Sequence, residues 1–461
     1  MAHSSKTTTL VPLSQQLSRS ENDIIAFRKH QPLTVNDLKK QVWRIYSALN
    51  HYSNQYWALS MQDSFNFVAG LLALLYAGKM PKLLNPYHQE IQHYYNGLLT
   101  DNINSDEKFL TDKIIIQINQ LDDTTLVDDY QCLNTEFKQQ ILTLFTSGST
   151  GLPKPIDKSV SQLEKEIQIL IDNWGSFSND LFVASVSHEH MYGLTFKIML
   201  SLSSKIPFLC EPVVYQEQLA KYQQKQIIYI TTPSIIKNLD NNLPPIKCDK
   251  VISSGGKLSY KEALYCQQNF NVLPNEIYGS SETGIIATRQ QHTTTTPWQL
   301  FSSIHIEQAQ TQQPLLISPL LAKPEPLNDK IKKVDDRHFH LYGRQDKIVK
   351  ISENRVSLTY IERKIQQLKQ VNEVIIIPLE QNNRTILGAV ITLSPTYKSL
   401  LKQYNHLKLT QYFRLLLKDI LSLNEIPKKW RFVELIPKNS QEKCTYIELK
   451  ALFDATKKNN E

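Results

Sequence analysis

Residues 1–342 alternate between two hydrophobic patterns. Residues 226–233 (QIIYITTP) and 250–253 (KVIS) are short runs of β-branched and aromatic residues, which are typical of buried strands. Residues 234–239 and 259–270 follow these runs and have helical patterns. Alternation of this kind predicts an α/β fold with parallel-type sheets.

Residues 159–174 give the clearest single helix. Apolar side chains recur there at spacings of three and four, which places them on one face of an α-helix. They are Val160, Leu163, Ile167, Leu170, Ile171 and Trp174. The segment therefore predicts an amphipathic helix.

A different unit begins at residue 343. Its pattern predicts strands at 347–351, 374–379, 386–393 and 430–435, and helices at 358–368 and 410–423. This is enough mixed structure for a small domain. We therefore divide the chain into an N-terminal α/β domain, residues 1–342, and a smaller α+β C-terminal domain, residues 343–461, which we expect to be mobile.

The composition excludes several classes of protein. Hydrophobic residues make up 41% and charged residues 21% of the chain, as in ordinary globular proteins. No apolar run reaches the roughly 18 to 20 residues of a membrane helix, and the N-terminus lacks the apolar core of a signal peptide. We expect a cytoplasmic protein without a membrane span. The 5 cysteines are odd in number and form no CxxC pair, which argues against a disulfide framework or a zinc knuckle.

Charge and glycine content narrow the picture further. The net charge of +7 is spread along the chain without long basic tracts, so we expect no nucleic-acid partner. Such a surplus suits anionic small molecules equally well. Glycine is scarce, at 13 of 461 residues, where roughly 7% is usual. The places where glycines cluster therefore stand out.

Residues 144–154 (LFTSGSTGLPK) are the most informative segment. Glycines let backbone N–H groups close on an anion, hydroxyls add donors and a lysine adds charge, so this composition suits a polyphosphate. The segment is not a Walker A loop, because Pro153 stands where GxxxxGK[ST] requires its second glycine. The alternative is a surface loop rich in serine, threonine and glycine.

The segment from Thr146 to Lys154 matches [ST]SG[ST]TGxPK at every fixed position, and the chain here resembles the adenylate-forming superfamily of acyl- and aryl-CoA synthetases. Four further motifs of that family follow in order. They are SSGGKL at 253–258, YGSSETG at 278–284, GRQD at 343–346 with Lys350, and Pro437 with Lys438 and Lys443. Five ordered motifs make the resemblance far more specific than any one of them.

The resemblance implies an ATP site. The residues implied to cradle the β- and γ-phosphates are Thr146, Ser147, Gly148, Ser149, Thr150 and Gly151, with Lys154 supporting the loop. Gly255, Gly256 and Gly279 belong to the nucleotide motifs that follow. Tyr278 would stack on adenine, since a flat ring suits a purine face.

The same resemblance assigns the catalytic residues. Ser281 would bind the α-phosphate, and Glu282 would hold Mg²⁺, which prefers oxygen ligands. Counting back from Gly343 to the family's ribose-binding aspartate reaches Asp329, with Arg344 as its partner, although Asn328 before it departs from the motif.

The implied reaction is attack of a carboxylate on the α-phosphorus of ATP, which depends mainly on positioning and charge neutralisation. Lys443 would bridge the carboxylate and the α-phosphate. The small domain would then swing about Asp346 and admit a thiol of CoA or phosphopantetheine, which takes the acyl group and releases AMP.

Residues 185–194 (SVSHEHMYGL) resemble the acyl-pocket motif of the family, and His190 and Gly193 match it. A zinc site is an alternative, since His188 and His190 would share a strand face and His338 and His340 form a second HxH pair. Amino-acid-activating domains place an aspartate in this region. None lies between residues 181 and 194, which disfavours an amino-acid substrate.

Three departures leave alternatives open. Glu353 and Glu442 stand where the family has glycine, and only 46 residues separate Glu282 from Asp329, which indicates a compact branch. Either the thioester step is impaired, or a chain poor in glycine tolerates these replacements. The leading hypothesis is an ATP-dependent acid–thiol ligase for an aryl or fatty acid, acting on CoA or an acyl carrier protein. The alternatives are an adenylase that serves only a carrier protein, or a degenerate member that binds nucleotide or acyl ligand without turnover.

Overall fold

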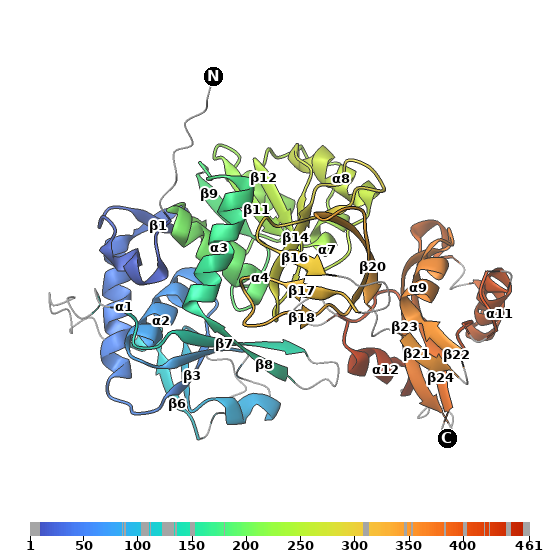
Figure 1. Cartoon of the computed structure of the whole chain (residues 1–461), viewed down its shortest axis with the longest axis horizontal. Coiled ribbons are helices and arrows are strands. Elements are labelled where there is room, and N and C mark those ends of the chain that lie inside the picture. The colour runs from blue at the N-terminus through green and yellow to red at the C-terminus, as the bar shows by residue number, and fades with distance from the viewer. Residues whose placement is uncertain are drawn as a thin grey trace.

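The structure is a computed structural model with two large sheets in its N-terminal part and a smaller C-terminal region (Figure 1). It describes residues 10–454 except 85, 87–88, 103–109, 111, 122–132, 134–135, 148–152, 179, 308–312, 345–347, 352–353, 382–383, 400–402, 419, 424 and 439–443. The mixed α/β class predicted from the sequence is confirmed.

The first sheet joins strands from the N-terminal third of the chain. Its order is β6 (Ile114–Gln117), β5 (Gly97–Thr100), β3 (Tyr56–Ser60), β4 (Met80–Leu83), β7 (Ile141–Ser147) and β8 (Pro153–Ser159). The pairs from β6 to β7 are parallel, and β7 and β8 form an antiparallel hairpin. The predicted phosphate loop is therefore the connection of a hairpin at the edge of this sheet.

The second sheet has 11 strands. Its order is β19 (Asp329–Lys333), β20 (His338–Arg344), β15 (Trp298–Leu300), β14 (Gly284–Arg289), β13 (Asn275–Ser280), β12 (Lys250–Ser253), β11 (Ile227–Thr231), β9 (Leu181–Ala184), β10 (Phe208–Leu209), β1 (Ile24–Arg28) and β2 (Gln31–Thr34). The strands from β13 to β1 pair in parallel, and both ends of the sheet are antiparallel. Because parallel strands end at one common edge, the segments after β9, β11, β12 and β13 meet there.

Several helices of this part begin at a residue whose side chain caps the first turn. They are α1 (Val35–Leu49), α2 (Ser64–Tyr76), α3 (Val160–Trp174), α4 (Met191–Gly193), α5 (Leu200–Ser204), α6 (Gln216–Ala220), α7 (Pro233–Lys237) and α8 (Tyr260–Phe270), with a π-helix at Leu194–Met199 (η7) and a 3-10 helix at Leu13–Ser18 (η1). Ser159 caps α3 by accepting from the Gln162 N–H, and Gly175 ends it at φ +76°. The predicted amphipathic helix is therefore confirmed.

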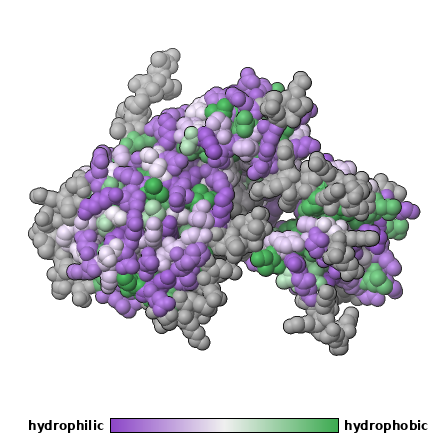
Figure 2. Space-filling view, turned by 60° about the horizontal axis from the view of Figure 1, so that its bottom comes forward, coloured by the Kyte–Doolittle hydropathy of each residue, from purple (hydrophilic) through white to green (hydrophobic). Residues whose placement is uncertain are grey.

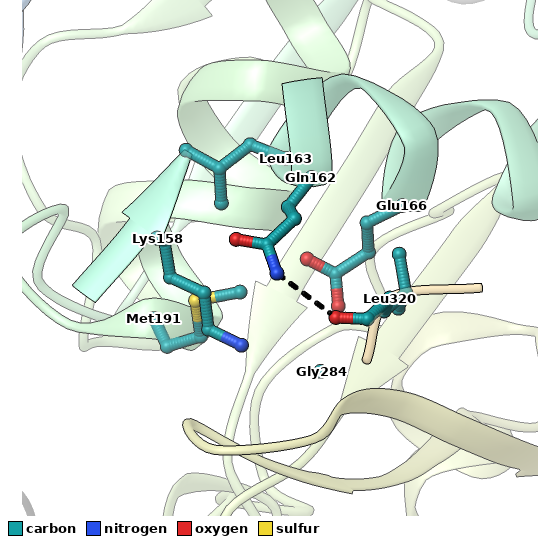
Figure 3. Close-up of a pocket in the computed structure, with 7 residues that line it drawn as sticks. All are labelled: Lys158, Gln162, Leu163, Glu166, Met191, Gly284 and Leu320. Atoms are coloured by element: carbon teal, nitrogen blue, oxygen red, sulfur yellow. Dashed lines mark hydrogen bonds between the residues drawn. The ribbon is translucent and has the colours of Figure 1, made fainter. Parts of the chain in front are cut away.

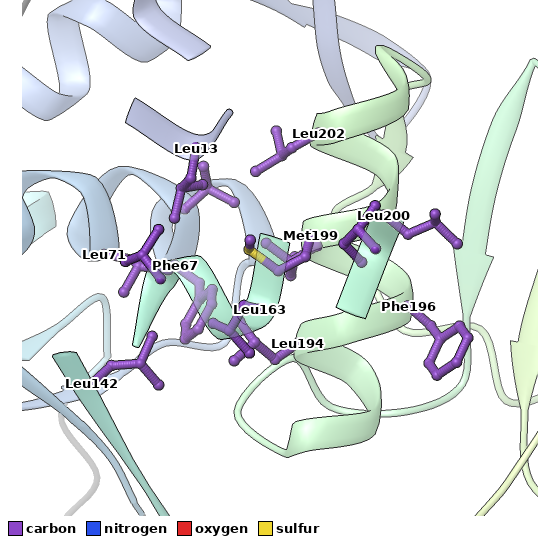
Figure 4. Close-up of a cluster of buried hydrophobic side chains, with 14 of the residues drawn as sticks. Leu13, Phe67, Leu71, Leu142, Leu163, Leu194, Phe196, Met199, Leu200 and Leu202 are labelled. Atoms are coloured by element: carbon purple, nitrogen blue, oxygen red, sulfur yellow. The ribbon is translucent and has the colours of Figure 1, made fainter. Parts of the chain in front are cut away.

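The main hydrophobic core lies among helices that pack between the two large sheets, and it includes residues of both sheets. Figure 4 shows Phe67 and Leu71 of α2 meeting Leu163 of α3 and Leu194 and Met199 of η7. Helix α2 is buried around nearly its whole circumference, which explains its continuous apolar sequence. Among the described residues no helix combines the length and the apolarity needed to cross a bilayer.

The C-terminal region contains the hairpin β21 (Ile348–Ile351) and β22 (Asn354–Ser357), and a sheet of β23 (Val371–Gln381), β24 (Arg384–Leu393) and β25 (Lys429–Phe432). Its helices are α9 (Leu358–Gln366), α11 (His406–Leu417) and α12 (Tyr446–Asp454). Helix α11 begins earlier than the predicted residue 410, because the Asn405 side chain accepts from the Lys408 N–H and caps it. The core residues of this region run from Ile351 to Phe453 and form clusters separate from the N-terminal core. The proposed boundary at 342 and 343 lies between the two sets.

Candidate active site

The predicted phosphate loop connects β7 and β8. Thr146 lies opposite Lys154 in the hairpin and Ser147 lies opposite Pro153. Thr146 is half-buried and Lys154 is exposed. The remaining residues predicted here, Gly148, Ser149, Thr150 and Gly151, lie outside the described residues.

The turn between β13 and β14 carries Ser281 and Glu282, both half-buried. Ser280 and Thr283 close this turn, since the Ser280 N–H donates to Thr283 Oγ1 and the Thr283 N–H donates to Ser280 Oγ. Gly284 has φ +71°, a conformation that favours glycine. The backbone thus places Ser281 and Glu282 at the tip of a tightly closed turn.

Tyr278 and Asp329 lie 51 residues apart in sequence but are in direct contact. The Tyr278 hydroxyl donates to Asp329 Oδ2 at 2.6 Å. The Tyr278 ring also packs against Trp298 and Phe339, with ring centroids at 5.8 and 5.9 Å. Asp329 is paired with Arg344 in the register of β19 and β20, so three residues predicted for the adenosine part of ATP converge here.

The glycine pair Gly255 and Gly256 follows β12 at the same edge of the sheet. Both residues are exposed, and Gly255 has φ +88° with no atom near the position of a Cβ. Gly279 in the neighbouring strand has the opposite environment, since a Cβ there would lie 2.4 Å from the Gly284 carbonyl oxygen. Gly279 is therefore required by close backbone contact, and Gly255 by its backbone conformation.

The predicted acyl-pocket residues follow β9. His190 is half-buried and immediately precedes α4, and a Cβ on Gly193 would lie 2.0 Å from the Ser187 carbonyl oxygen. His188 is buried and binds through both ring nitrogens, with Nδ1 2.9 Å from Ser64 Oγ and Nε2 3.0 Å from the Met61 carbonyl oxygen. Burial lowers the pKa of His188 to about 3. The zinc alternative loses its first ligand, because both nitrogens of His188 have protein partners.

Three charged groups near this edge, the buried Lys158 and Glu166 and the half-buried Glu189, were not predicted. Glu166 lies on α3 and Lys158 on β8, and burial raises the pKa of Glu166 and lowers that of Lys158. Glu189 accepts from the Met61 N–H at 3.0 Å, and burial raises its pKa to about 7. The sequence did hold a signal for Glu166, since it follows Leu163 by three positions and so lies on the apolar face of its helix.

The residues predicted for the later chemistry are only partly described. Asp346, Glu353, Glu442 and Lys443 lie outside the described residues. Arg344 lies in β20, and Lys438 forms an ion pair with Glu373 at 3.3 Å. The structure therefore brings together the adenosine-side residues Tyr278, Asp329 and Arg344, and it does not describe the proposed catalytic lysine.

Comparison with known proteins finds distant relatives that are named as ligases. No model of a known protein family matches the chain. It is 24% identical over 353 residues to a D-alanine--D-alanyl carrier protein ligase of Staphylococcus epidermidis, covering 66% of this chain and 70% of that protein. It is 22% identical over 445 residues to a putative long chain fatty acid-CoA ligase, VraA, of Staphylococcus aureus, covering 87% and 92%.

Solved structures share the fold over nearly the whole chain. A benzoate CoA ligase from Burkholderia xenovorans superposes with a TM-score of 0.73 at 16% identity, covering 95% of this chain and 100% of that one. ATP-bound MatB from Rhodopseudomonas palustris superposes with a TM-score of 0.76 at 14% identity, covering 97% and 99%. At these identities the likeness shows the fold, with a large N-terminal and a small C-terminal domain.

Proposed function

We propose, from the premise that this chain belongs to the adenylate-forming superfamily, that it is an AMP-forming acid–thiol ligase. It activates a carboxylic acid with ATP to an acyl- or aryl-adenylate and passes the acyl group to CoA or to the pantetheine of a carrier protein. The observation that supports this best is the contact between Tyr278 and Asp329 at the edge where the other nucleotide motifs meet. The named relatives, CoA ligases and a carrier protein ligase, support the same reaction class.

The proposed nucleotide site uses residues of both sheets. Residues 146–151 and Lys154 bind the β- and γ-phosphates, and Ser281 binds the α-phosphate. Tyr278 stacks on adenine while its hydroxyl orients Asp329, which binds the ribose hydroxyls with Arg344. Gly255 and Gly256 keep backbone, rather than side chains, against the nucleotide, and Gly279 lets its strand lie close to Gly284.

The donors at the β13–β14 turn fit a magnesium ion. Glu282 is half-buried at its tip and offers carboxylate oxygens, the ligand type that Mg²⁺ prefers. Glu282 would hold the ion, which would supply charge neutralisation for the phosphates. Ser281 would bind the α-phosphate.

The reaction then needs groups from the C-terminal domain, residues 343–461. A carboxylate oxygen of the substrate attacks the α-phosphorus, the bond to the β-phosphate oxygen breaks, and pyrophosphate leaves with the electron pair. Lys443 holds the attacking carboxylate and the α-phosphate together. The domain rotates about Asp346, a thiol attacks the acyl carbon, and AMP leaves while the thiol proton passes to solvent.

The substrate is an aryl or fatty acid, bound near His190 and Gly193. D-alanine is named for one relative, but no aspartate that could hold a substrate amine lies in residues 181–194. The cytoplasm supplies ATP and CoA, and we place the enzyme there. Glu353 and Glu442 favour a second candidate, a protein that binds nucleotide or acyl ligand without turnover.

A pyrophosphate-release screen separates these candidates. The panel holds benzoates, cinnamates, fatty acids and D-alanine, with Glu282→Ala as the inactive control. Release that requires one acid and is lost in the variant supports the ligase, and CoA and phosphopantetheinylated carrier protein are then compared as acceptors. ATP binding without release across the whole panel would overturn turnover and support the second candidate.

A further inference from the structure

The turn that carries Glu282 is held from behind by two charged side chains. Lys158 Nζ donates to the Glu282 carbonyl oxygen at 2.7 Å. Glu166 Oε1 accepts from the Ile285 N–H at 2.7 Å. These two bonds hold the backbone at the tip of the turn, Glu282, and at the second residue of β14, Ile285.

Both side chains are deeply buried in the same cluster. Lys158 is 4% exposed and Glu166 is 2% exposed. Figure 3 shows them facing the space above Gly284, with Gln162, Leu163, Met191 and Leu320 around them, and this space is too small for a water molecule. Burying a charged group away from water is costly unless the group has hydrogen-bond partners. Lys158 and Glu166 each find such a partner in the backbone at the turn.

Gly284 lets the carboxylate approach the turn. A Cβ at this position would lie 2.8 Å from Glu166 Oε1, and the residue has φ +71°. Any side chain would therefore displace Glu166 or the turn. Gly284, at the end of the YGSSETG motif, is therefore required for the close approach of the Glu166 carboxylate.

The cluster also connects the turn to two other predicted parts of the site. Lys158 follows Lys154 by four residues on β8, so both side chains leave the same face of the strand that begins at the phosphate loop. Glu166 Oε2 accepts from Thr195 Oγ1 at 3.0 Å, and Thr195 follows Gly193 by two residues. Strand β8 and helix α3 therefore contact the phosphate loop, the β13–β14 turn and the acyl segment.

We infer that Lys158 and Glu166 are positioning residues for Glu282 and Ser281, and that they fix the magnesium-binding turn relative to the phosphate loop and the acyl segment. This rests on the proposed function. A carboxylate that holds a metal against a phosphate must be placed within a fraction of an ångström, and pinning its own carbonyl and a neighbouring amide supplies that placement.

The first test measures the local stability of the turn and does not require enzymatic activity. Lys158→Met keeps the apolar stem and removes the donor, Glu166→Ala removes the acceptor, and Glu166→Gln keeps an acceptor for the Ile285 N–H. Hydrogen–deuterium exchange of the segment 278–289 is expected to rise about tenfold in Lys158→Met and Glu166→Ala, and to stay near wild type in Glu166→Gln. Lys165→Met, at an exposed position of the same helix, is the matched control.

The second test reads magnesium. In Lys158→Met the Mg²⁺ concentration that gives half-maximal MgATP binding is expected to rise about tenfold, while binding of ATP in EDTA and the melting temperature stay close to those of Lys165→Met. A lowered melting temperature with unchanged exchange of residues 278–289 and unchanged Mg²⁺ dependence would show that the cluster only fills space. If the wild type does not bind MgATP, the proposed function fails, and the exchange experiment still decides whether the turn is pinned.

Discussion

The N-terminal and C-terminal regions bury different kinds of side chain. Among the described residues, the N-terminal region buries seven charged side chains, Lys79, Lys82, Asp101, Lys158, Glu166, Lys197 and Glu276. The described part of the C-terminal region buries only uncharged polar groups, Gln370 and Thr392, beside an apolar core. Figure 2 shows apolar side chains at several places on the surface of the smaller lobe, and also at places on the larger one.

This difference indicates that buried side chains have different roles in the two regions. A buried charge with fixed partners holds backbone segments in place but adds little net stability, whereas an apolar core mainly adds stability. Two of the buried charges, Lys158 and Glu166, hold the turn that carries Glu282 in the proposed site. We therefore expect substitutions of buried charges in the N-terminal region to affect function more than stability. Substitutions in the apolar core of the C-terminal region should mainly lower its stability.

The largest expected effect is on the C-terminal core. Trp430 is 1% exposed, lies among Phe413 and Phe432, and donates through Nε1 to the Pro427 carbonyl oxygen at 2.9 Å. Trp430→Ala is expected to lower the free energy of unfolding of this region by about 3–5 kcal/mol. Urea-dependent proteolysis of residues 371–393 measures this, with the exposed Leu423→Ala as the near-neutral control. Loss of ATP binding in Trp430→Ala would contradict the separation of the two regions, because the N-terminal ATP site would then depend on the C-terminal core.

The next effect concerns the chemistry supplied by the C-terminal region. Lys443→Ala is expected to lower acid-dependent pyrophosphate release about 10²- to 10³-fold, because one charge-stabilising group is lost in the transition state. ATP affinity, which we assign to the N-terminal region, is expected to change little. The control is Lys450→Ala, at an exposed position on α12. Normal acyl-adenylate formation in Lys443→Ala would show that the catalytic assignment is wrong.

A third prediction tests the cost of a buried charge in the N-terminal region. Lys197 is 1% exposed, donates to the Cys210 carbonyl oxygen at 3.3 Å, and burial lowers its pKa from 10.5 to about 8. Between pH 8 and 10.5 the unfolded chain binds more protons at this group than the folded chain does. The free energy of unfolding should therefore rise with pH, by at most about 1.4 kcal/mol per pH unit.

Lys197→Met should lack this rise. Urea unfolding of both proteins from pH 7 to 10 measures the difference between them, which cancels the titration of Asp63, Glu211 and Cys210 nearby. Below about pH 8 both states are protonated at Lys197, so the variant is expected to be the more stable protein there. Parallel curves for the two proteins would mean that this lysine stays charged in the folded state.

The smallest effect concerns the contact that supports the nucleotide site best. Tyr278→Phe keeps the ring and removes the hydroxyl that donates to Asp329. The dissociation constant for ATP is expected to rise about fivefold, equal to about 1 kcal/mol, because Asp329 loses its orientation toward the ribose. Calorimetry measures this, and Tyr404→Phe, at an exposed position, is the control. An unchanged affinity would remove Asp329 from the proposed site.

Local patterns predicted several elements well. The helix at residues 159–174 was found from its apolar spacing, and its observed bounds differ by one residue. The predicted start of helix α11 was wrong, because the Asn405 cap precedes the first apolar residue that the prediction used. The strand β22 and helix α12 were missed because their sequences are short and mixed in character.

What the sequence determined by itself was the list of motifs, because glycine, hydroxyl and lysine spacing is a local property of the chain. The expected class of chemistry came from the resemblance of those motifs to a known family. The tertiary structure alone decided which distant groups share one site. Tyr278 on β13 contacts Asp329 on β19 although β14, β15 and β20 lie between these strands in the order of the sheet. Lys158 and Glu166 reach the β13–β14 turn from β8 and α3, outside that sheet. No spacing along the chain encodes such contacts, because they arise from strand order and from the packing that closes it.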